Sequence, residues 1–132
     1  MIVHRTAISS IFFVIAICLS SQLCIAQTES TSSIIEYEQF QEVVKDKSIQ
    51  LIDVRTPKEY NEGYIAFAKN IPIKKRKKFK APVQKLDKEK KIYVYCYSGV
   101  RSRRASRILK QLGFRKIYDF KGGWKKWNEH QN

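Results

Sequence analysis

A seven-residue segment of this chain combines a nucleophile with groups that could hold an anion: Cys96-Tyr97-Ser98-Gly99-Val100-Arg101-Ser102. It begins where an apolar, strand-like run ends and stops where an amphipathic helical pattern starts. A loop in that position can turn its backbone N–H groups inward, and the helix adds its positive end. Gly99 permits the turn, and Arg101 supplies a permanent charge with a fork of donors. These groups favour the thiolate of Cys96, which is the nucleophilic form.

A second interpretation of Cys96 treats it as a small apolar residue that ends a core strand, as most free cysteines are. The spacing of Gly99 and Arg101 and the helix that follows favour the reactive thiol. The only histidine after the first 26 residues is His130, near the end of the chain. A Cys–His pair is therefore not expected.

The elements that must position this segment alternate between strand and helix patterns. Strands are predicted at 34–35, 49–54, 70–73, 92–96 and 116–120. Helices are predicted at 37–44, from Pro57, at 102–112 and around Trp124 and Trp127, with Gly122-Gly123 as the turn before the last of these. Such alternation predicts an α/β domain with a central, mostly parallel sheet of about five strands and helices on both faces. Ligands of such sheets bind beyond the carboxyl ends of the strands, where Cys96 lies.

The chain has 132 residues, which suits one domain, and its first part has the pattern of a secretory signal. Residues 1–26 are predicted to be a signal peptide, 27–33 a flexible leader and 34–130 the domain. The apolar run in the signal is shorter than the roughly 20 residues of a membrane-spanning helix, although an uncleaved anchor is the alternative. The expected location is the periplasm or the exterior, and the exported chain would keep Cys96 as its single cysteine.

Several segments in order resemble the rhodanese-like domain family, in the form of small, exported thiosulfate sulfurtransferases. The resemblance rests on Cys-x-x-Gly-x-Arg-Ser at Cys96–Ser102, Leu-Ile-Asp-Val-Arg at 51–55 with Glu59 and Tyr60, the segment 63–72 ending Ala-x-Asn-Ile-Pro, and 113–127 with Gly122-Gly123 and Trp127. It covers about 34–127. Two positions depart from the family pattern: Tyr64 stands where histidine is usual, and Phe67 where glycine is usual.

The resemblance implies a sulfurtransferase that works through a persulfide on Cys96. Thiosulfate or a similar anionic donor would give its outer sulfur to Cys96, and cyanide or a thiol would accept it. The substrate-binding positions would be Arg101, Tyr97, Ser98, Gly99, Val100 and Ser102, mainly through their backbone. Neither a cofactor nor a metal is implied.

Asp53 and Arg55 are interpreted as structural, with Asp53 bonded to nearby backbone or arginine and Arg55 paired with Glu59 four residues later. Trp124 and Trp127 are interpreted as core residues.

The net charge of +14 favours anionic partners. The block 74–80 is expected to be a solvated loop, because its charges repel one another. It could contact an anionic surface through Lys74, Lys75, Arg76, Lys77, Lys78 and Lys80. Nucleic acid is not an expected partner of an exported protein.

Two rival functions remain at this point. A cysteine phosphatase or arsenate reductase uses Cys-x5-Arg, but here Ser102 occupies the arginine position and Arg101 comes one residue earlier. A non-catalytic rhodanese-like binding module would usually lack the cysteine, which this chain retains.

Overall fold

The computed structural model describes residues 29–131. The predicted signal peptide at 1–26 and the start of the predicted leader lie outside these residues. Within 29–131, no helix is both long enough and apolar enough to cross a membrane.

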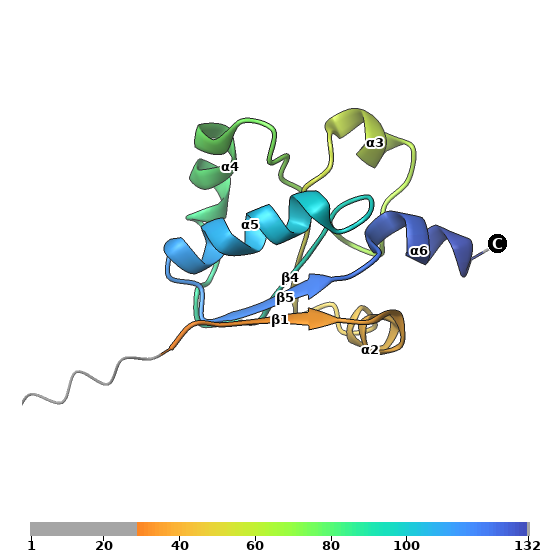
Figure 1. Ribbon diagram of the computed structural model, residues 1–132, viewed down its shortest axis with the longest axis horizontal. Coiled ribbons are helices and arrows are strands. Elements are labelled where there is room, and N and C mark those ends of the chain that lie inside the picture. The colour runs from red at the N-terminus through yellow and green to blue at the C-terminus, as the bar shows by residue number, and fades with distance from the viewer. Residues whose placement is uncertain (1–28, 132) are drawn as a thin grey trace, which may run out of the picture.

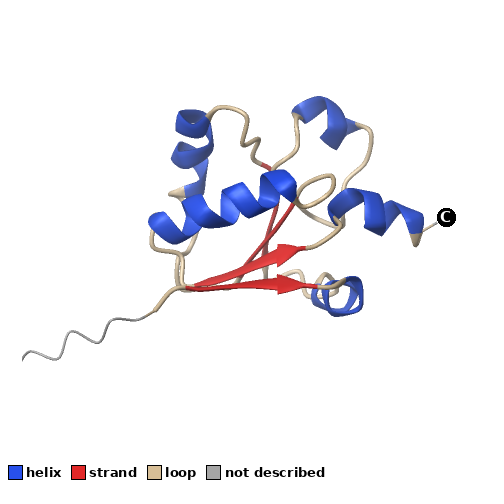
Figure 2. Ribbon diagram, viewed as in Figure 1, coloured by secondary structure: helices blue, strands red, loops and turns tan. Residues whose placement is uncertain are grey.

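The centre of the fold is a five-stranded sheet in the order β1-β5-β4-β2-β3, and every strand pair is parallel (Figure 2). The strands are β1 (Thr31–Ile35), β2 (Gln50–Asp53), β3 (Lys69–Asn70), β4 (Ile92–Tyr95) and β5 (Lys116–Phe120). Because β1 begins at Thr31, the last three residues of the predicted leader belong to the sheet. Their pairing with β5 supplies the backbone hydrogen bonds that a flexible segment would lack.

Four helices connect the strands: α2 (Tyr37–Val43), α3 (Pro57–Asn61), α4 (Arg76–Val83) and α5 (Val100–Gln111). A fifth, α6 (Gly123–Glu129), follows the last strand. In Figure 1, α4 and α5 lie on one side of the sheet and α2 on the other. The side chains of α2 and α6 share a second hydrophobic cluster, which places α6 with α2. The predicted α/β fold with helices on both faces is therefore confirmed.

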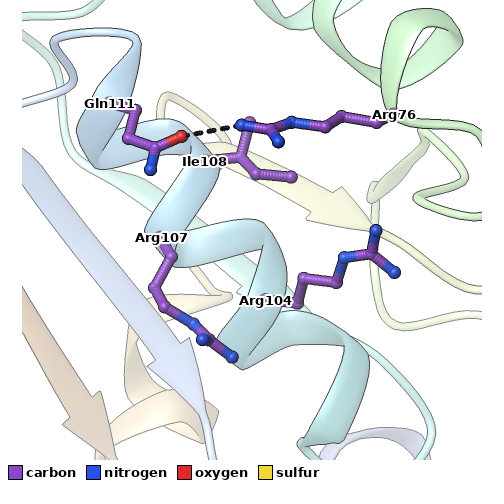
Figure 3. Close-up of a pocket in the computed structure, with 5 residues that line it drawn as sticks. All are labelled: Arg76, Arg104, Arg107, Ile108 and Gln111. Atoms are coloured by element: carbon purple, nitrogen blue, oxygen red, sulfur yellow. Dashed lines mark hydrogen bonds between the residues drawn. The ribbon is translucent and has the colours of Figure 1, made fainter.

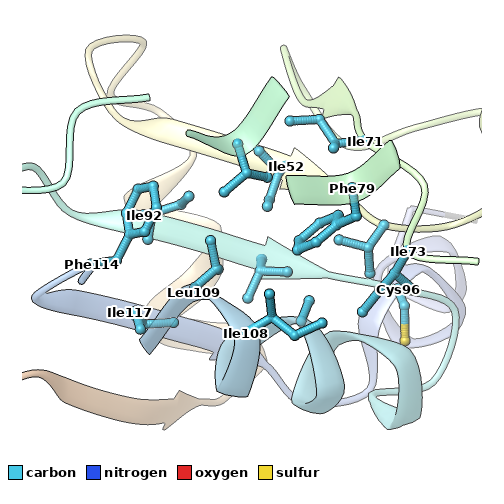
Figure 4. Packing of buried hydrophobic residues seen from close by; sticks show 14 residues of the cluster. Ile52, Ile71, Ile73, Phe79, Ile92, Cys96, Ile108, Leu109, Phe114 and Ile117 are labelled. Carbon is cyan, nitrogen blue, oxygen red and sulfur yellow. The ribbon is translucent and has the colours of Figure 1, made fainter. Parts of the chain in front are cut away.

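The central strand β4 separates two hydrophobic clusters. All four of its residues are buried, and successive side chains point to opposite faces, as the pleat requires. Ile92, Val94 and the following Cys96 belong to the cluster under α4 and α5 (Figure 4), whereas Tyr93 and Tyr95 belong to the other. The register of one strand thus decides the face to which the cysteine points.

The basic block is not the loop that its charge predicts, since most of it forms α4. Phe79 and Val83 lie four residues apart on the buried side of this helix and are completely covered. Burying a side chain of that size contributes about 2–3 kcal/mol, which offsets the repulsion among cations that stay in solvent. The apolar anchors therefore decide the structure of the segment.

The segment between α3 and β3 avoids backbone strain at Phe67. The left-handed residue is its neighbour Ala66, with φ of 48°. A glycine-only conformation is therefore not needed where the family pattern has glycine.

Candidate active site

Cys96 lies at the carboxyl end of the central strand and is a free, buried cysteine, with 1% of its surface exposed. Figure 4 shows it at one end of the hydrophobic cluster, near the first turn of α5. The position is the one at which parallel sheets bind ligands. The residue is nonetheless almost covered, so a reactant can reach its sulfur only if neighbouring groups move.

The loop after Cys96 is held from behind by α6. The backbone N–H of Trp124 donates to the carbonyl of Cys96 at 2.8 Å, and that of Lys125 donates to the carbonyl of Tyr97 at 3.0 Å. The N–H and C=O of one peptide point in opposite directions. The N–H groups of Tyr97 and Ser98 therefore point away from α6.

Gly123 makes this close contact possible. Its φ is +55°, and a Cβ built there would stand 2.2 Å from the carbonyl oxygen of Cys96. The sequence pattern Gly122-Gly123 predicted only a turn before the helix. This local pattern does not indicate that Gly123 packs against the loop after Cys96. That contact joins segments 27 residues apart in the chain.

Gly99 links the thiol to α5. Its N–H donates to the Cys96 sulfur at 3.1 Å, and its left-handed backbone, with φ of +92°, forms the N-cap of α5. Its carbonyl accepts from the buried Ser102 hydroxyl at 3.1 Å and from the N–H of Arg103 at 3.2 Å. The predicted turn at Gly99 is therefore present, and it directs one backbone donor at the sulfur.

The side chains of the loop divide into an exposed set and a buried one. Tyr97 is 45% exposed, Val100 is 73% exposed and Ser98 is also in solvent, whereas Ser102 is buried. The exposed three can offer the inside of the loop only their backbone groups.

Arg101 forms a two-pronged ion pair with Glu59 on α3. Its two terminal nitrogens donate to the two carboxylate oxygens at 2.6 and 2.7 Å. This pairing lowers the pKa of Glu59 to about 2, mainly through the hydrogen bond from Arg101. It also raises the pKa of Arg101, to which the nearby Cys96 side chain adds a smaller effect. Arg101 is thus near the thiol, but its guanidinium is already paired with the carboxylate of Glu59.

Glu59 is fixed in place by the first turn of α3. The Thr56 hydroxyl accepts from the N–H of Glu59, and the Glu59 carboxylate accepts from the N–H and the hydroxyl of Thr56. This is a capping box, in which the two residues satisfy each other's free backbone donors. The sequence Thr-Pro-Lys-Glu carries this signature and could have shown that Glu59 is engaged at the helix start.

The predicted pairing of Arg55 with Glu59 is wrong. Arg55 is buried with Asp53, at 2.7 Å, and donates to the carbonyl of Gly63 at 2.6 Å. Its guanidinium also lies 4.7 Å from the centre of the Trp124 ring. A charge this deeply buried needs a carboxylate close by. Asp53 is itself fully buried and meets that condition, whereas Glu59 lies nearer the surface. The structural interpretation of Asp53 is consistent with this contact.

One further ionisable group, the carboxyl of Asp119, lies beside the start of α5. Asp119 on β5 is buried next to Ser102, and burial raises the pKa of its carboxyl. One of its oxygens and the Ser106 hydroxyl have no hydrogen-bond partner. No grouping of metal-binding side chains occurs among residues 29–131.

Comparison with known proteins identifies the family. A family model of the rhodanese-like domain matches residues 36–130. An uncharacterized protein of Bacillus subtilis, YqhL, is 43% identical over 81 residues, which are 61% of this chain and 62% of that protein. The thiosulfate sulfurtransferase GlpE of Coxiella burnetii is 36% identical over 89 residues, 67% of this chain and 80% of that protein. A rhodanese-related protein from Thermoplasma volcanium has the same fold, with a TM-score of 0.63, 34% identity and coverage of 77% of this chain and 92% of that one.

Proposed function

The chain belongs to the rhodanese-like domain family, and we propose that it is an exported thiosulfate sulfurtransferase with Cys96 as the nucleophile. The observation that carries the proposal is the donor geometry at the thiol. The Gly99 N–H donates to the Cys96 sulfur, and the contacts with α6 turn the next two N–H groups away from that helix. Family-level sulfurtransferase function agrees with relatives of that name.

The first half of the reaction forms a persulfide. The Cys96 thiolate attacks the outer sulfur of thiosulfate, the S–S bond of thiosulfate breaks, and sulfite leaves with the bonding electron pair. The product is Cys96–S–S⁻, whose terminal sulfur carries the negative charge. Backbone N–H groups of the loop would stabilise that charge, because aligned amides attract anions without requiring a counterion.

The second half returns the enzyme to its starting state. A thiophilic acceptor, either cyanide or a thiolate, attacks the terminal sulfur, and the Cys96 thiolate is the leaving group. No electrons are gained or lost overall, so neither a redox cofactor nor a metal is required.

Arg101 would orient the donor while remaining paired with Glu59. Both terminal nitrogens already bind the carboxylate, which leaves the guanidinium only part of its donor capacity for a second anion. This arrangement does not favour a phosphatase, in which an arginine must wrap a phosphate dianion.

The central test is intact-mass analysis after incubation with thiosulfate. The expected product carries one added sulfur atom, which cyanide removes as thiocyanate. Cys96→Ser should show neither effect. Persulfide on the Ser variant, or none on a folded wild type, would contradict the proposed chemistry.

Export is a separate part of the proposal and needs a separate measurement. Cell fractionation followed by mass analysis of the N-terminus should find a chain that begins at Gln27 outside the cytoplasm. A chain that retains Met1 and remains with the membrane would instead support the anchored alternative.

We extend the proposal to a surface contact by the basic block. Lys74, Lys75, Lys77 and Lys78 are exposed, and none forms an ion pair with a carboxylate of residues 29–131. Vesicles with anionic lipid should bind the protein at low salt and release it steeply as salt rises. Binding that is insensitive to salt would contradict an electrostatic contact.

A further inference from the structure

Three arginines line a hollow between α4 and α5, apart from the Cys96 loop. Arg104, Arg107, Ile108 and Gln111 lie at helical spacing on one face of α5, and Arg76 opens α4 opposite them. These five residues line a space of about 160 Å³. In Figure 3, Arg76 reaches across from α4 to the end of α5, whereas Arg104 and Arg107 leave the middle of α5 in different directions.

Among residues 29–131, no carboxylate lies close enough to form an ion pair with the arginines of this hollow. Arg76 donates to the amide oxygen of Gln111 at 3.0 Å, and that partner is neutral. Arg104 and Arg107 form no ion pair with any carboxylate of the described chain. Elsewhere in this chain, Arg55, Arg101 and Arg115 each pair with a carboxylate.

The start of α4 adds to this excess of positive charge. Its first turn contains no acidic residue, and Lys75 at the N-cap makes no side-chain hydrogen bond to the helix. Free N–H groups and cations therefore meet at the positive end of the helix dipole, an arrangement that an anion would stabilise.

The size and chemistry of the hollow limit what it could hold. Liquid water occupies about 30 Å³ per molecule, so the space has room for a small inorganic anion and is below the usual range of organic ligand pockets. Guanidinium groups match the paired oxygens of phosphate and sulfate. The side chain of Ile108 lines the hollow, and an apolar wall strengthens charge interactions beside it.

We propose that this hollow is a binding site for a small tetrahedral oxyanion of the phosphate or sulfate class. On binding, the flexible side chains of Arg104 and Arg107 turn toward an anion held beside Arg76, and attraction to the anion replaces repulsion among the three cations. The site does not depend on sulfur transfer at Cys96. A failure of one proposal therefore leaves the other standing.

Titration calorimetry with inorganic phosphate, sulfate and pyrophosphate tests the site directly, with sodium chloride at matched ionic strength as the reference. We expect saturable binding of at least one oxyanion and none of chloride. The stronger of phosphate and sulfate identifies the preferred anion. Resonances of the Arg76, Arg104 and Arg107 side-chain N–H groups should shift with the same dissociation constant.

Matched variants locate the binding. Arg104→Gln and Arg107→Gln should each raise the dissociation constant of the oxyanion at least about tenfold, because each removes a charge-assisted hydrogen bond. Gln111→Glu should abolish binding by placing a carboxylate beside Arg76. Arg115→Gln removes an arginine that pairs with Glu89 elsewhere and should bind like the wild type.

Three results would overturn the proposal. These are binding no stronger than that of chloride, equal weakening in Arg104→Gln and Arg115→Gln, or binding of a long polyanion such as heparin without binding of any small oxyanion. The last would indicate a diffuse charged surface in place of a defined site.

Discussion

Arg101 stands between the carboxylate of Glu59 and the thiol of Cys96. The carboxylate is the stronger partner, because it binds both terminal nitrogens and causes most of the rise in the pKa of Arg101. Glu59 therefore positions the arginine, and in the proposed reaction it would compete with the donor anion for it. The strength of that pair can be measured through its pH dependence.

Glu59→Gln should lower stability at pH 7 by about 1 kcal/mol, a value typical of a partly exposed ion pair with good geometry. The folded pKa of Glu59 is about 2, below its ordinary value of 4.5. A lowered pKa stabilises the folded state above about pH 4.5, and this contribution is lost as the pH falls toward 2. Urea unfolding at pH 7, 4 and 3 should show the difference between wild type and variant shrinking. A difference that does not change with pH would mean that Glu59 acts without its charge.

Asp119→Asn should have the opposite effect. Burial raises the pKa of Asp119, so its charged form opposes folding once the pH exceeds the ordinary value of 3.8. The Asn variant should therefore have a higher Tm than the wild type at pH 7, and the gain should vanish near pH 3. A variant less stable than wild type at pH 7 would show that the contacts of the carboxylate with Ser102 and Arg103 outweigh its burial.

At the scale of elements, the site depends on how α6 meets the loop after β4. The first N–H groups of α6 bind the loop carbonyls, which is how a helix start satisfies its free donors. Gly123 allows the approach, and Gly113 offers a matched comparison. Gly113 has a similar left-handed backbone, with φ of +89°, but a Cβ there would make only an ordinary contact, with Lys88 Cδ at 3.9 Å.

Gly123→Ala should nearly abolish sulfur transfer, because its Cβ would collide with the Cys96 carbonyl and displace the loop. We also expect a loss of about 2–4 kcal/mol of stability from overpacking and backbone strain. Gly113→Ala should lose only about 1 kcal/mol and keep full activity. Thiocyanate production per folded molecule and urea unfolding provide the two measurements. Equal activity in both variants would mean that the contact with α6 does not position the loop.

The sequence predicts the elements better than the contacts between them. Hydrophobic patterns predict β2, β4, β5 and α5 correctly, because a buried strand or an amphipathic helix has a recognisable order of apolar residues within its own segment. The partner of Glu59 and the role of Gly123 depend on segments distant in the chain, and no local pattern encodes them. The loop prediction for the basic block is wrong because repulsion among its charges is outweighed by the burial of Phe79 and Val83, which are its only buried apolar anchors in α4.

At the scale of the whole molecule, the net charge of +14 opposes compact structure. The repulsion is strongest at the start of α4, because this helix begins with consecutive basic residues at the positive end of its own dipole. Lys77 and Lys78 are exposed in this first turn, so replacing them alters charge without altering the core.

Lys77→Glu combined with Lys78→Glu should stabilise the protein by about 1 kcal/mol at low salt, since acidic residues suit the first turn of a helix. Lys47→Glu combined with Lys90→Glu makes the same change in net charge at exposed positions outside any helix. If the repulsion is local, this control pair should gain less, and both gains should shrink in 0.5 M NaCl as the charges are screened. Urea midpoints at the two salt concentrations measure the effect. Equal gains in stability would mean that only the total charge matters and that repulsion is not concentrated at the start of α4.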